Sequence, residues 1–325
     1  MNTGAGVRLL EDCRVDLGRP LVIVNPRSGA GLSEARWARV RGALADGLGE
    51  IDSAFTTGPR DATAIATREA AAGRRLIIAL GGDGTISEVA DGVLQAGAAV
   101  AAATEIALIP RGTGGDFRRT LELPHDIGAA ARHIRDTAAQ AVDAGRVRYR
   151  AHDGSEAVRH FVNVASFGFS SAVASRANAS SKRFGGRIAF FAATLRELIA
   201  HDNRDVWLTL DGQERLRRRV MMAAVGNGRF FGGGMKICPD ARINDGVLDL
   251  VTVGDLSRGE VVVNLGKLYE GTHLELEDVK SARVSHLVAE SVDADAMIPV
   301  ELDGETPGFL PATFDILPGA LRIRA

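Results

Sequence analysis

Residues Leu76–Thr85 read Leu-Ile-Ile-Ala-Leu-Gly-Gly-Asp-Gly-Thr and give the clearest indication of the fold class. The apolar residues Leu76–Leu80 predict a strand that is buried on both faces. The glycine-rich run Gly81–Thr85 ends that strand, and the apolar pattern after it predicts a helix over Ile86–Gln95. A buried strand that passes through a glycine turn into a helix is typical of a parallel α/β sheet.

The same cycle of strand, turn and helix recurs on both sides of this stretch. The apolar run Leu21–Val24 enters the turn Asn25–Gly29, and a strand over Glu105–Ile109 enters the glycine-rich run Pro110–Phe117. This alternation predicts a parallel sheet wrapped by helices over residues 19–144. The other elements expected there are a strand at 51–56 and helices at 34–44, 61–72 and 127–135.

The pattern changes after about residue 144. Short β-type runs follow one another and are linked by Asp-Gly turns, which predicts a mostly antiparallel β domain over residues 145–307. Residues 308–325 are expected to return to the first domain. The predicted strands are 146–149, 160–164, 206–210, 218–225, 247–253, 281–288 and 298–302, and the predicted helices are 186–201 and 258–267.

The composition argues against several classes of protein. Lys and Arg total 39 against 41 Asp and Glu, and the formal net charge of −2 argues against a dedicated nucleic-acid binder. The two cysteines, Cys13 and Cys238, are far apart and lack metal-ligand spacing, which argues against a disulfide framework or a zinc site. No apolar run is long enough to cross a bilayer. We expect a cytoplasmic protein whose residues 1–18 form an N-terminal extension.

The glycine run at 81–85 is also the first candidate for chemistry. Open α/β sheets bind ligands at the carboxyl ends of their strands, where free N–H groups of a following helix meet an anion. Asp83 is unusual there, because a carboxylate among phosphate-binding amides is unfavourable unless it handles a proton or a metal ion. The alternative is a plain glycine turn with Thr85 as the N-cap of the helix.

Two other strand ends have similar loops, at Asn25–Gly29 and Gly112–Asp116. Parallel strands place all three loops on one edge of the sheet. The sequence contains neither GxxxxGK[ST] nor GxGxxG, so the common P-loop and dinucleotide fingerprints are absent. A nucleotide at this edge must therefore be held by another set of residues.

These motifs resemble the diacylglycerol kinase catalytic family, which includes bacterial lipid kinases and the sphingosine and ceramide kinases. The likeness continues in family order from Leu21 to Arg324. It implies an N-terminal α/β nucleotide domain similar to those of phosphofructokinases and NAD kinases, followed by a β-sandwich domain with the lipid cleft. The matching segments are VNPRSGAG (24–31), GGDGT (81–85), PRGTGGDF (110–117), GNGRFFGGG (226–234), CPDARINDGVLDL (238–250) and LDGE (302–305).

The resemblance implies ATP as the phosphoryl donor, with Asp83 nearest the transferred phosphoryl group. Gly115 departs from the family pattern, which usually has Asn at this position. The implied ATP-binding residues are Asn25, Ser28, Thr56, Gly81, Gly82, Asp83, Gly84, Thr85, Glu88, Gly112 and Thr113.

Two kinds of Mg²⁺ site are implied in the same way. Asp116 and Asp143 resemble acidic partners of the catalytic Mg²⁺, which would position the phosphates and neutralise charge during phosphoryl transfer. A structural Mg²⁺ would be held by the Asp245 carboxylate and by the backbone carbonyls of Arg242 and Val247. The alternative for Asp245 is an ordinary Asx turn.

Glu305 follows the turn Asp303-Gly304, and by resemblance it is the base that takes the proton of the lipid hydroxyl. Taken alone, Asp-Gly-Glu is usually the exposed tip of a hairpin. The implied reaction transfers the γ-phosphoryl group of ATP to a lipid alcohol, with diacylglycerol giving phosphatidic acid as the leading case. The alternatives are another lipid alcohol (a sphingoid base, ceramide or phosphatidylglycerol), a soluble-substrate kinase similar to NAD kinase, and a non-catalytic nucleotide- or lipid-binding protein.

A lipid acceptor implies peripheral contact with a membrane surface. The segment 184–200 has apolar residues at helical spacing behind Lys182, Arg183 and Arg187, and it either contacts lipid headgroups or packs in the core. A second basic cluster, within Arg215–Arg219, is either a membrane contact or a solvated strand edge. A homodimer is left open beside a monomer.

Overall fold

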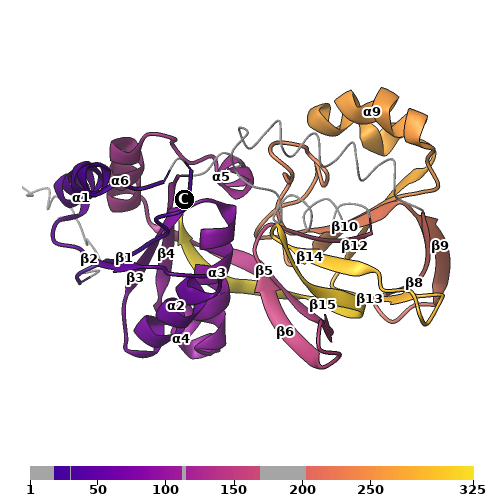
Figure 1. Ribbon diagram of the computed structural model, residues 1–325, viewed down its shortest axis with the longest axis horizontal. Coiled ribbons are helices and arrows are strands. Elements are labelled where there is room, and N and C mark those ends of the chain that lie inside the picture. The colour runs from indigo at the N-terminus through magenta and orange to yellow at the C-terminus, as the bar shows by residue number, and fades with distance from the viewer. Residues whose placement is uncertain (1–17, 30, 112–114, 169–202) are drawn as a thin grey trace, which may run out of the picture.

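The computed structural model describes residues 18–29, 31–111, 115–168 and 203–325, and it forms two units (Figure 1). The first unit contains four parallel strands in the order β2-β1-β3-β4. Every residue of β1, β3 and β4 is buried, as expected for parallel strands covered on both faces. The strands are β1 (Leu21–Val24), β2 (Asp52–Phe55), β3 (Leu76–Gly81) and β4 (Glu105–Pro110).

Helices cover both faces of this parallel sheet (Figure 1). One face packs against α1 and α6 through a core that includes Val22, Leu44 and Ile134. The other face packs against α2, α3 and α4, and α5 lies toward the second unit. The bounds are α1 (Glu34–Leu48), α2 (Asp61–Ala71), α3 (Asp83–Gln95), α4 (Ala98–Ala103), α5 (Asp116–Thr120) and α6 (Ile127–Asp136).

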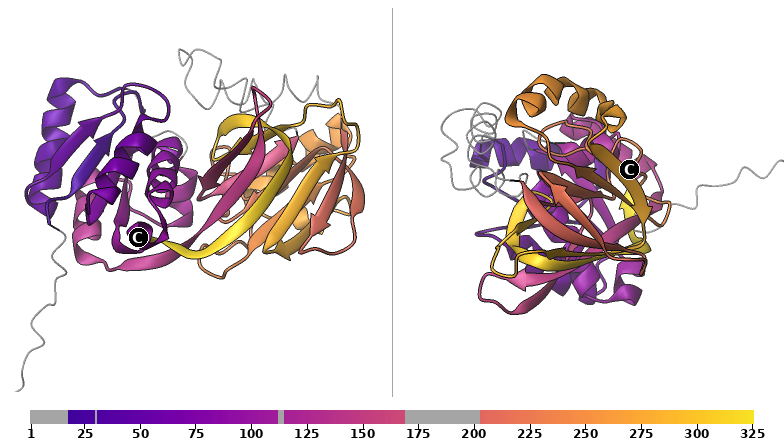
Figure 2. Two further views of the ribbon diagram at one scale, coloured as in Figure 1. Left: turned by 90° about the horizontal axis from the view of Figure 1, so that it is seen from below. Right: turned by 90° about the vertical axis from the view of Figure 1, so that its right-hand side faces the viewer.

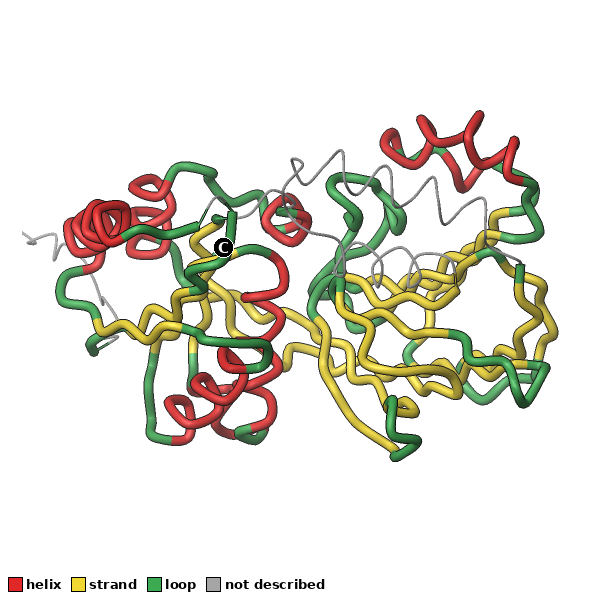
Figure 3. The backbone as a smooth tube through the Cα atoms, in the orientation of Figure 1, coloured by secondary structure: helices red, strands yellow, loops and turns green. Residues whose placement is uncertain are grey.

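The second unit consists mostly of strands (Figure 3), and these pair antiparallel, as predicted. One sheet has the order β14-β7-β10-β11-β12, and the other has the order β6-β5-β15-β13-β8-β9. The two share a core in which the rings of Phe167 and Phe314 lie 6.1 Å apart. The elements are β5 (Ala139–Ala151), β6 (Glu156–Phe161), β7 (Val164–Gly168), β8 (Arg204–Leu210), β9 (Leu216–Val220), β10 (Met222–Gly226), β11 (Leu248–Val253), α9 (Arg258–Glu270), the 3-10 helix η1 (His273–Glu275), β12 (Val279–Val284), β13 (His286–Ser291), β14 (Pro299–Leu302) and β15 (Glu305–Arg324).

Strand β15 joins the two units. Most of its length pairs with β5, and the two strands run together from the second unit into the first (Figure 2). Its last residues, Arg322–Arg324, pair in parallel with β4. The buried guanidinium of Arg324 then donates to the Glu105 carboxylate and to the carbonyls of Ile134 and Thr137. The parallel sheet therefore contains a strand from each end of the chain.

Two of the predicted strands are wrong, because each is in fact two strands. The predicted strand 218–225 divides at Met221, where the chain leaves β9 in one sheet and enters β10 in the other. The predicted strand 281–288 divides at Ser285 between β12 and β13. There the Asp211 carboxylate accepts the backbone N–H groups of Ser285 and His286, which replace strand pairing.

A third predicted strand, 160–164, is the junction between β6 and β7. The predicted helix at 86–95 begins earlier, at Asp83, so most of the GGDGT run is helical. The predicted helix at 186–201 lies outside the described residues, as does nearly all of the N-terminal extension.

Helix α3 makes polar contacts with the second unit. Asp83, Ser87 and Asp91 lie one turn apart and therefore share one face of this helix. Asp91 is buried and accepts hydrogen bonds from the His160 backbone N–H (3.1 Å), the His160 ring (2.9 Å) and the Arg60 guanidinium (2.6 Å). Burial raises the pKa of Asp91, but the hydrogen bonds from His160 and Arg60 outweigh burial and bring the pKa to about 2.

Replacing Asp91 with Asn should weaken the attachment of β6 to α3. The pKa shift from 3.8 to about 2 corresponds to about 2 kcal/mol of stability in the charged form. Because the folded pKa lies below the unfolded one, this contribution is complete above 3.8 and is lost as pH falls through about 2. We expect Asp91→Asn to lower the free energy of unfolding by about 2 kcal/mol near neutral pH, measured by urea denaturation.

The exposed Asp46 on α1 provides the matched control, because Asp46→Asn removes the same charge without a buried partner. The difference between wild type and Asp91→Asn should shrink below a pH of about 4. A difference that does not change with pH would contradict this account of the contact.

Candidate active site

Three loops meet at the carboxyl edge of the parallel sheet, where the sequence predicts the nucleotide. The Asn25 side chain, after β1, donates through Nδ2 to Oγ1 of Thr85 at 3.2 Å. The backbone N–H of Arg111, after β4, donates to the carbonyl of Gly81 at 2.6 Å. These contacts connect the loops that follow β1, β3 and β4 into one surface.

The glycines of this edge allow close approach of the backbone. A Cβ at Gly81 would lie 2.2 Å from Oγ1 of Thr85, so a larger residue would displace the buried Thr85. Gly82 is the N-cap of α3, and a Cβ at Gly84 would meet no atom within 4 Å. The N-terminus of α3 is therefore capped without a side chain and has open space beside it.

The other predicted ATP-binding residues have different surroundings. Ser28 donates from its hydroxyl to the Asn25 carbonyl at 2.9 Å, and Thr56 continues from β2 with its N–H bonded to Val24. Glu88 turns to the start of α2, where its carboxylate accepts the N–H groups of Arg60 and Ala62, each at 3.1 Å. Gly112 and Thr113 lie outside the described residues.

Asp83 and Asp116 are brought together, as the sequence predicts. The Asp83 carboxylate accepts the backbone N–H groups of Asp116 and Phe117, both at 3.0 Å, and so caps the start of α5. The Asp116 carboxylate accepts the Gly233 N–H at 2.7 Å and the Arg119 guanidinium at 2.8 Å. This pair of carboxylates lies where the first unit meets the glycine-rich loop of the second.

The environment of Asp116 disfavours its charge. Burial, and then the neighbouring charge of Asp83, raise the pKa of Asp116 to about 6, although hydrogen bonds from Gly233 and a contact with Arg119 act in the opposite direction. A divalent cation near both carboxylates would relieve their repulsion. The pair therefore fits a cation chemically.

Glu305 begins β15, after the turn at Asp303-Gly304. Its carboxylate is partly exposed and forms an ion pair with Arg159 of β6 at 2.8 Å. The residue after Arg159, His160, contacts Asp91 of α3, so Glu305 lies on the α3 side of the first unit. Glu305 is therefore held by an arginine rather than projecting freely from a hairpin tip.

Asp303 has a larger structural role than its turn motif indicates. It adopts a left-handed conformation with φ of 48°. Its buried carboxylate accepts the backbone N–H groups of Val162, Asn163 and Val164, at 2.9 to 3.1 Å, and a side-chain hydrogen bond from Ser87 of α3. The Asp-Gly turn is visible in the sequence, but the strand junction that it binds is not. Asn163, for example, lies 140 positions before Asp303 in the chain.

Glu301 is a second acid that the sequence does not single out. It is buried two residues before Asp303 and accepts a hydrogen bond from the Ser166 hydroxyl at 2.7 Å. The pKa of Glu301 is raised to about 7. Burial is the largest cause, and the nearby charges of Asp303 and Asp116 act in the same direction. Glu301 and Asp303 thus belong to the hairpin that carries Glu305, and Glu301 is also close enough to Asp116 for their charges to interact.

Asp143 has separate partners from Asp83 and Asp116. It lies in β5, is buried, and accepts the N–H groups of Gly246 (2.7 Å) and Gly319 (2.6 Å). It therefore ties the Asp245 loop to the bend in β15. Its membership of a catalytic Mg²⁺ network remains a prediction.

The Asp245 carboxylate forms an ion pair with Arg283, and Asp245 also accepts a long hydrogen bond of 3.4 Å from Val247. An arginine therefore already neutralises this carboxylate. Within the described ranges, no group of three or more His, Cys, Asp or Glu residues is placed to hold a metal ion. The structural Mg²⁺ involving Arg242, Asp245 and Val247 remains a prediction.

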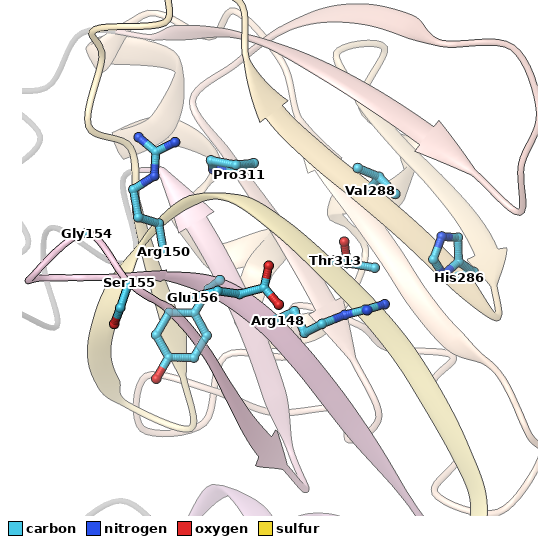
Figure 4. A pocket seen from close by; sticks show the side chains of 10 residues that line it. Arg148, Arg150, Gly154, Ser155, Glu156, His286, Val288, Pro311 and Thr313 are labelled. Atoms are coloured by element: carbon cyan, nitrogen blue, oxygen red, sulfur yellow. The ribbon is translucent and has the colours of Figure 1, made fainter.

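A cavity of about 550 Å³ opens on the outer face of the sheet that contains β5, β13 and β15 (Figure 4). Outward side chains of these strands line it, among them Arg148, Val288 and Thr313, whereas alternating residues such as Phe314 face the core. None of the predicted site residues lines it. The cavity is therefore separate from the candidate active site.

The basic cluster near residues 215–219 lies on the edge strand β9. Arg217 and Arg219 both contact Asp205, at 3.4 and 3.5 Å, and Arg215 pairs with Glu290 at 2.8 Å. Lys182, Arg183 and Arg187 lie outside the described residues. In the part of the chain that the structure describes, no helix has the length and apolar character needed to cross a membrane.

Asp303→Asn should destabilise the protein more than the same change at Asp211. Both residues occupy Asp-Gly turns with φ of 48° and accept backbone N–H groups of a distant strand junction, but Asp303 is half-buried and Asp211 is exposed. The new Nδ2 group would face buried donors at position 303. We expect losses of about 2 kcal/mol for Asp303→Asn and under about 1 kcal/mol for Asp211→Asn in urea unfolding. Equal losses would contradict the role given to Asp303.

Two known family models match this chain, one over each of the two units. The family model described as "Diacylglycerol kinase catalytic domain" matches residues 19–147. The model described as "YegS C-terminal NAD kinase beta sandwich-like domain" matches residues 163–325. A crystal structure of a diacylglycerol kinase from Bacillus anthracis str. Sterne superposes with a TM-score of 0.69 at 24% identity, covering 94% of this chain and 96% of that chain, which supports the fold.

Curated relatives extend over nearly the same length. The chain is 32% identical over 316 residues to "Diacylglycerol kinase" of Mycobacterium tuberculosis (strain ATCC 25618 / H37Rv), covering 95% of this chain and 96% of the relative. It is 29% identical to "Diacylglycerol kinase" of Staphylococcus carnosus (strain TM300), covering 91% of each. These matches confirm the resemblance seen in the sequence motifs. The chain belongs to the diacylglycerol kinase catalytic-domain family of lipid kinases, with a YegS-type C-terminal domain.

Proposed function

We propose that this protein uses ATP and Mg²⁺ to phosphorylate the hydroxyl group of diacylglycerol, giving phosphatidic acid. The observation that carries the proposal is the position of Asp83, which belongs to the glycine-rich nucleotide edge and also caps the helix whose Asp116 contacts the second unit. One site would then bind the phosphate groups on the side of the first unit and the acceptor on the side of the second unit. The names of the relatives support the acceptor class.

The triphosphate would bind at the joined loops of Asn25, Gly81–Thr85 and Arg111. The open N-terminus of α3 supplies N–H groups to anionic oxygens. Asn25 and Thr85 fix the spacing of two loops through their hydrogen bond. These residues would hold the donor in place, which is the main contribution that proteins make to phosphoryl transfer.

Mg²⁺ would be held near Asp83 and Asp116, whose paired carboxylates fit a cation. When bound, the ion would neutralise charge on the phosphates. Asp83 keeps its orientation through two N–H groups of α5, and Asp116 through Gly233 and Arg119. The protein's part is to hold both carboxylates at fixed positions before the substrates arrive.

Glu305 would take the proton of the acceptor hydroxyl. In the reaction, the hydroxyl oxygen forms a bond to the γ-phosphorus, the bond between that phosphorus and the ADP oxygen breaks, and the proton passes to the Glu305 carboxylate. The ion pair with Arg159 orients this carboxylate, and the Asp303 contacts hold the hairpin that carries it. Glu305 would thus act from the second unit on a phosphate held by the first.

Asp83→Asn should lower kcat by at least about a hundredfold while preserving the fold, because it removes a charge next to the transferred phosphoryl group. Asn retains one oxygen that can accept an α5 N–H group but turns its amide toward the other, so the variant should be less stable, and kcat is compared well below its melting temperature. The matched control is Asp61→Asn, a carboxylate in the first turn of α2 that bonds only local groups. A normal kcat for Asp83→Asn would remove Asp83 from the reaction.

Lipid phosphorylation can be measured with radiolabelled ATP and mixed micelles. We expect label in phosphatidic acid, with a rate that follows the mole fraction of diacylglycerol in the micelle, since the acceptor would be taken at a membrane surface. Mass spectrometry of products from extracted lipids would identify another lipid alcohol as the acceptor and so correct the substrate. Transfer to a water-soluble alcohol with no transfer to any lipid would overturn the proposal.

A further inference from the structure

Arg111 extends across the carboxyl edge of the parallel sheet. It follows β4, and its backbone N–H is anchored on the Gly81 carbonyl at the end of β3. Its guanidinium Nη2 donates to the carbonyl of Gly31, in the loop after β1. Because β3 lies between β4 and β1, the Arg111 side chain passes the end of β3, next to the GGDGT run.

A second arginine reaches the same point. Nη1 of Arg36, in α1, donates to the Gly31 carbonyl at 3.4 Å. Within the described ranges, neither Arg36 nor Arg111 forms an ion pair with a carboxylate. Burial, and then the charge of Arg36, lower the pKa of Arg111. The fold thus places two like charges together without an anion to neutralise them.

Arg111 also has an unused donor. Its Nη1 atom is buried and has no hydrogen-bond partner in the described structure. A buried donor without an acceptor is costly, and a charged donor more so. A purely structural link to the Gly31 carbonyl requires only one neutral donor, so it explains neither the second guanidinium nor the buried Nη1.

The loop around Arg111 is shaped for close packing. Gly29 adopts φ of 60°, and a Cβ there would lie 3.2 Å from the Arg111 carbonyl oxygen. The glycine loop after β1 and the start of the loop after β4 therefore touch. This contact keeps the guanidinium beside the three loops, where an anion would meet backbone N–H groups as well.

We propose that Arg111, with Arg36 beside it, binds the phosphate groups of the nucleotide. This inference rests on the proposed use of ATP and deepens it, because the ATP-binding residues expected from the family motifs include no cationic side chain. Arginine suits the task, since its planar fork remains charged and directs several N–H groups at phosphate oxygens. The ligand chemistry it selects is a polyphosphate rather than a nucleoside.

The test is direct binding by titration calorimetry of ATP, inorganic triphosphate and adenosine. Arg111→Ala should weaken ATP and triphosphate binding by about ten- to a hundredfold, the loss expected for one or two hydrogen bonds to a charged group. Adenosine binding should be unchanged. Arg36→Ala should show a smaller loss of the same kind. Arg41→Ala, an exposed arginine on α1, should bind all three ligands like wild type.

Two further measurements separate phosphate binding from loop structure. The loss in Arg111→Ala should fade as salt rises and screens the wild-type attraction. Arg111→Lys keeps the charge without the fork and should bind triphosphate more tightly than Arg111→Ala. Melting temperatures measured without ligand check that each variant folds. If Arg111→Ala does not fold, Arg111→Lys is compared with wild type instead.

The outcomes distinguish this inference from the proposed function. If wild type binds ATP and Arg111→Ala and Arg111→Lys bind it equally well, the inference fails and the proposed function stands. Equal losses for ATP and adenosine would also overturn it, because they would indicate a collapsed loop. If wild type binds neither ATP nor triphosphate, the proposed function fails and the inference fails with it.

Discussion

The proposed active site depends on one face of helix α3. Three acidic or hydroxyl side chains one turn apart, Asp83, Ser87 and Asp91, contact α5, the Asp303 turn and His160 in that order. The first turn of this helix lies at the proposed nucleotide edge, and the later turns hold the second unit. Because one rigid helix makes both kinds of contact, the helix sets the distance between the proposed phosphate-binding loops and the Glu305 hairpin.

This arrangement places several buried acids close to one another. Asp116, Glu301 and Asp303 all have raised pKa values, chiefly because they are buried. Such a concentration of acids costs stability and is common where a protein binds a cation or transfers protons. The arginines Arg111 and Arg36 form the opposite arrangement at the proposed nucleotide edge, where no carboxylate of the described residues pairs with their positive charges. A bound nucleotide with its cation would satisfy both.

Much of the fold could be predicted because its signals are local. The parallel strands are continuous apolar runs, and each enters a turn whose glycines are visible in the sequence. The divided strands were missed because their ends depend on distant carboxylates: Asp211 ends β12 at Ser285, and Asp303 separates β6 from β7. In both cases the Asp-Gly turn was visible, but its partner strand was not.

The sequence predicts which residues belong to the proposed site, but not which contacts hold them in place. Family motifs predict roles for Asp83, Asp116 and Glu305, but they do not show that Glu88 caps α2 or that Arg159 holds Glu305. Arg111 lies within a family motif, but its contact with a carbonyl 80 positions away in the sequence is visible only in the fold. Contacts between distant segments require the fold before they can be seen.

The central claim is that the nucleotide and the acceptor meet between the N-terminus of α3 and the Glu305 hairpin. A crystal structure with Mg²⁺ and a non-hydrolysable ATP analogue tests it most directly. We predict the triphosphate at the loops of Asn25 and Gly81–Thr85, with its terminal phosphate toward Asp83 and the hairpin. A triphosphate bound elsewhere, such as in the outer cavity lined by Arg148, would contradict the account.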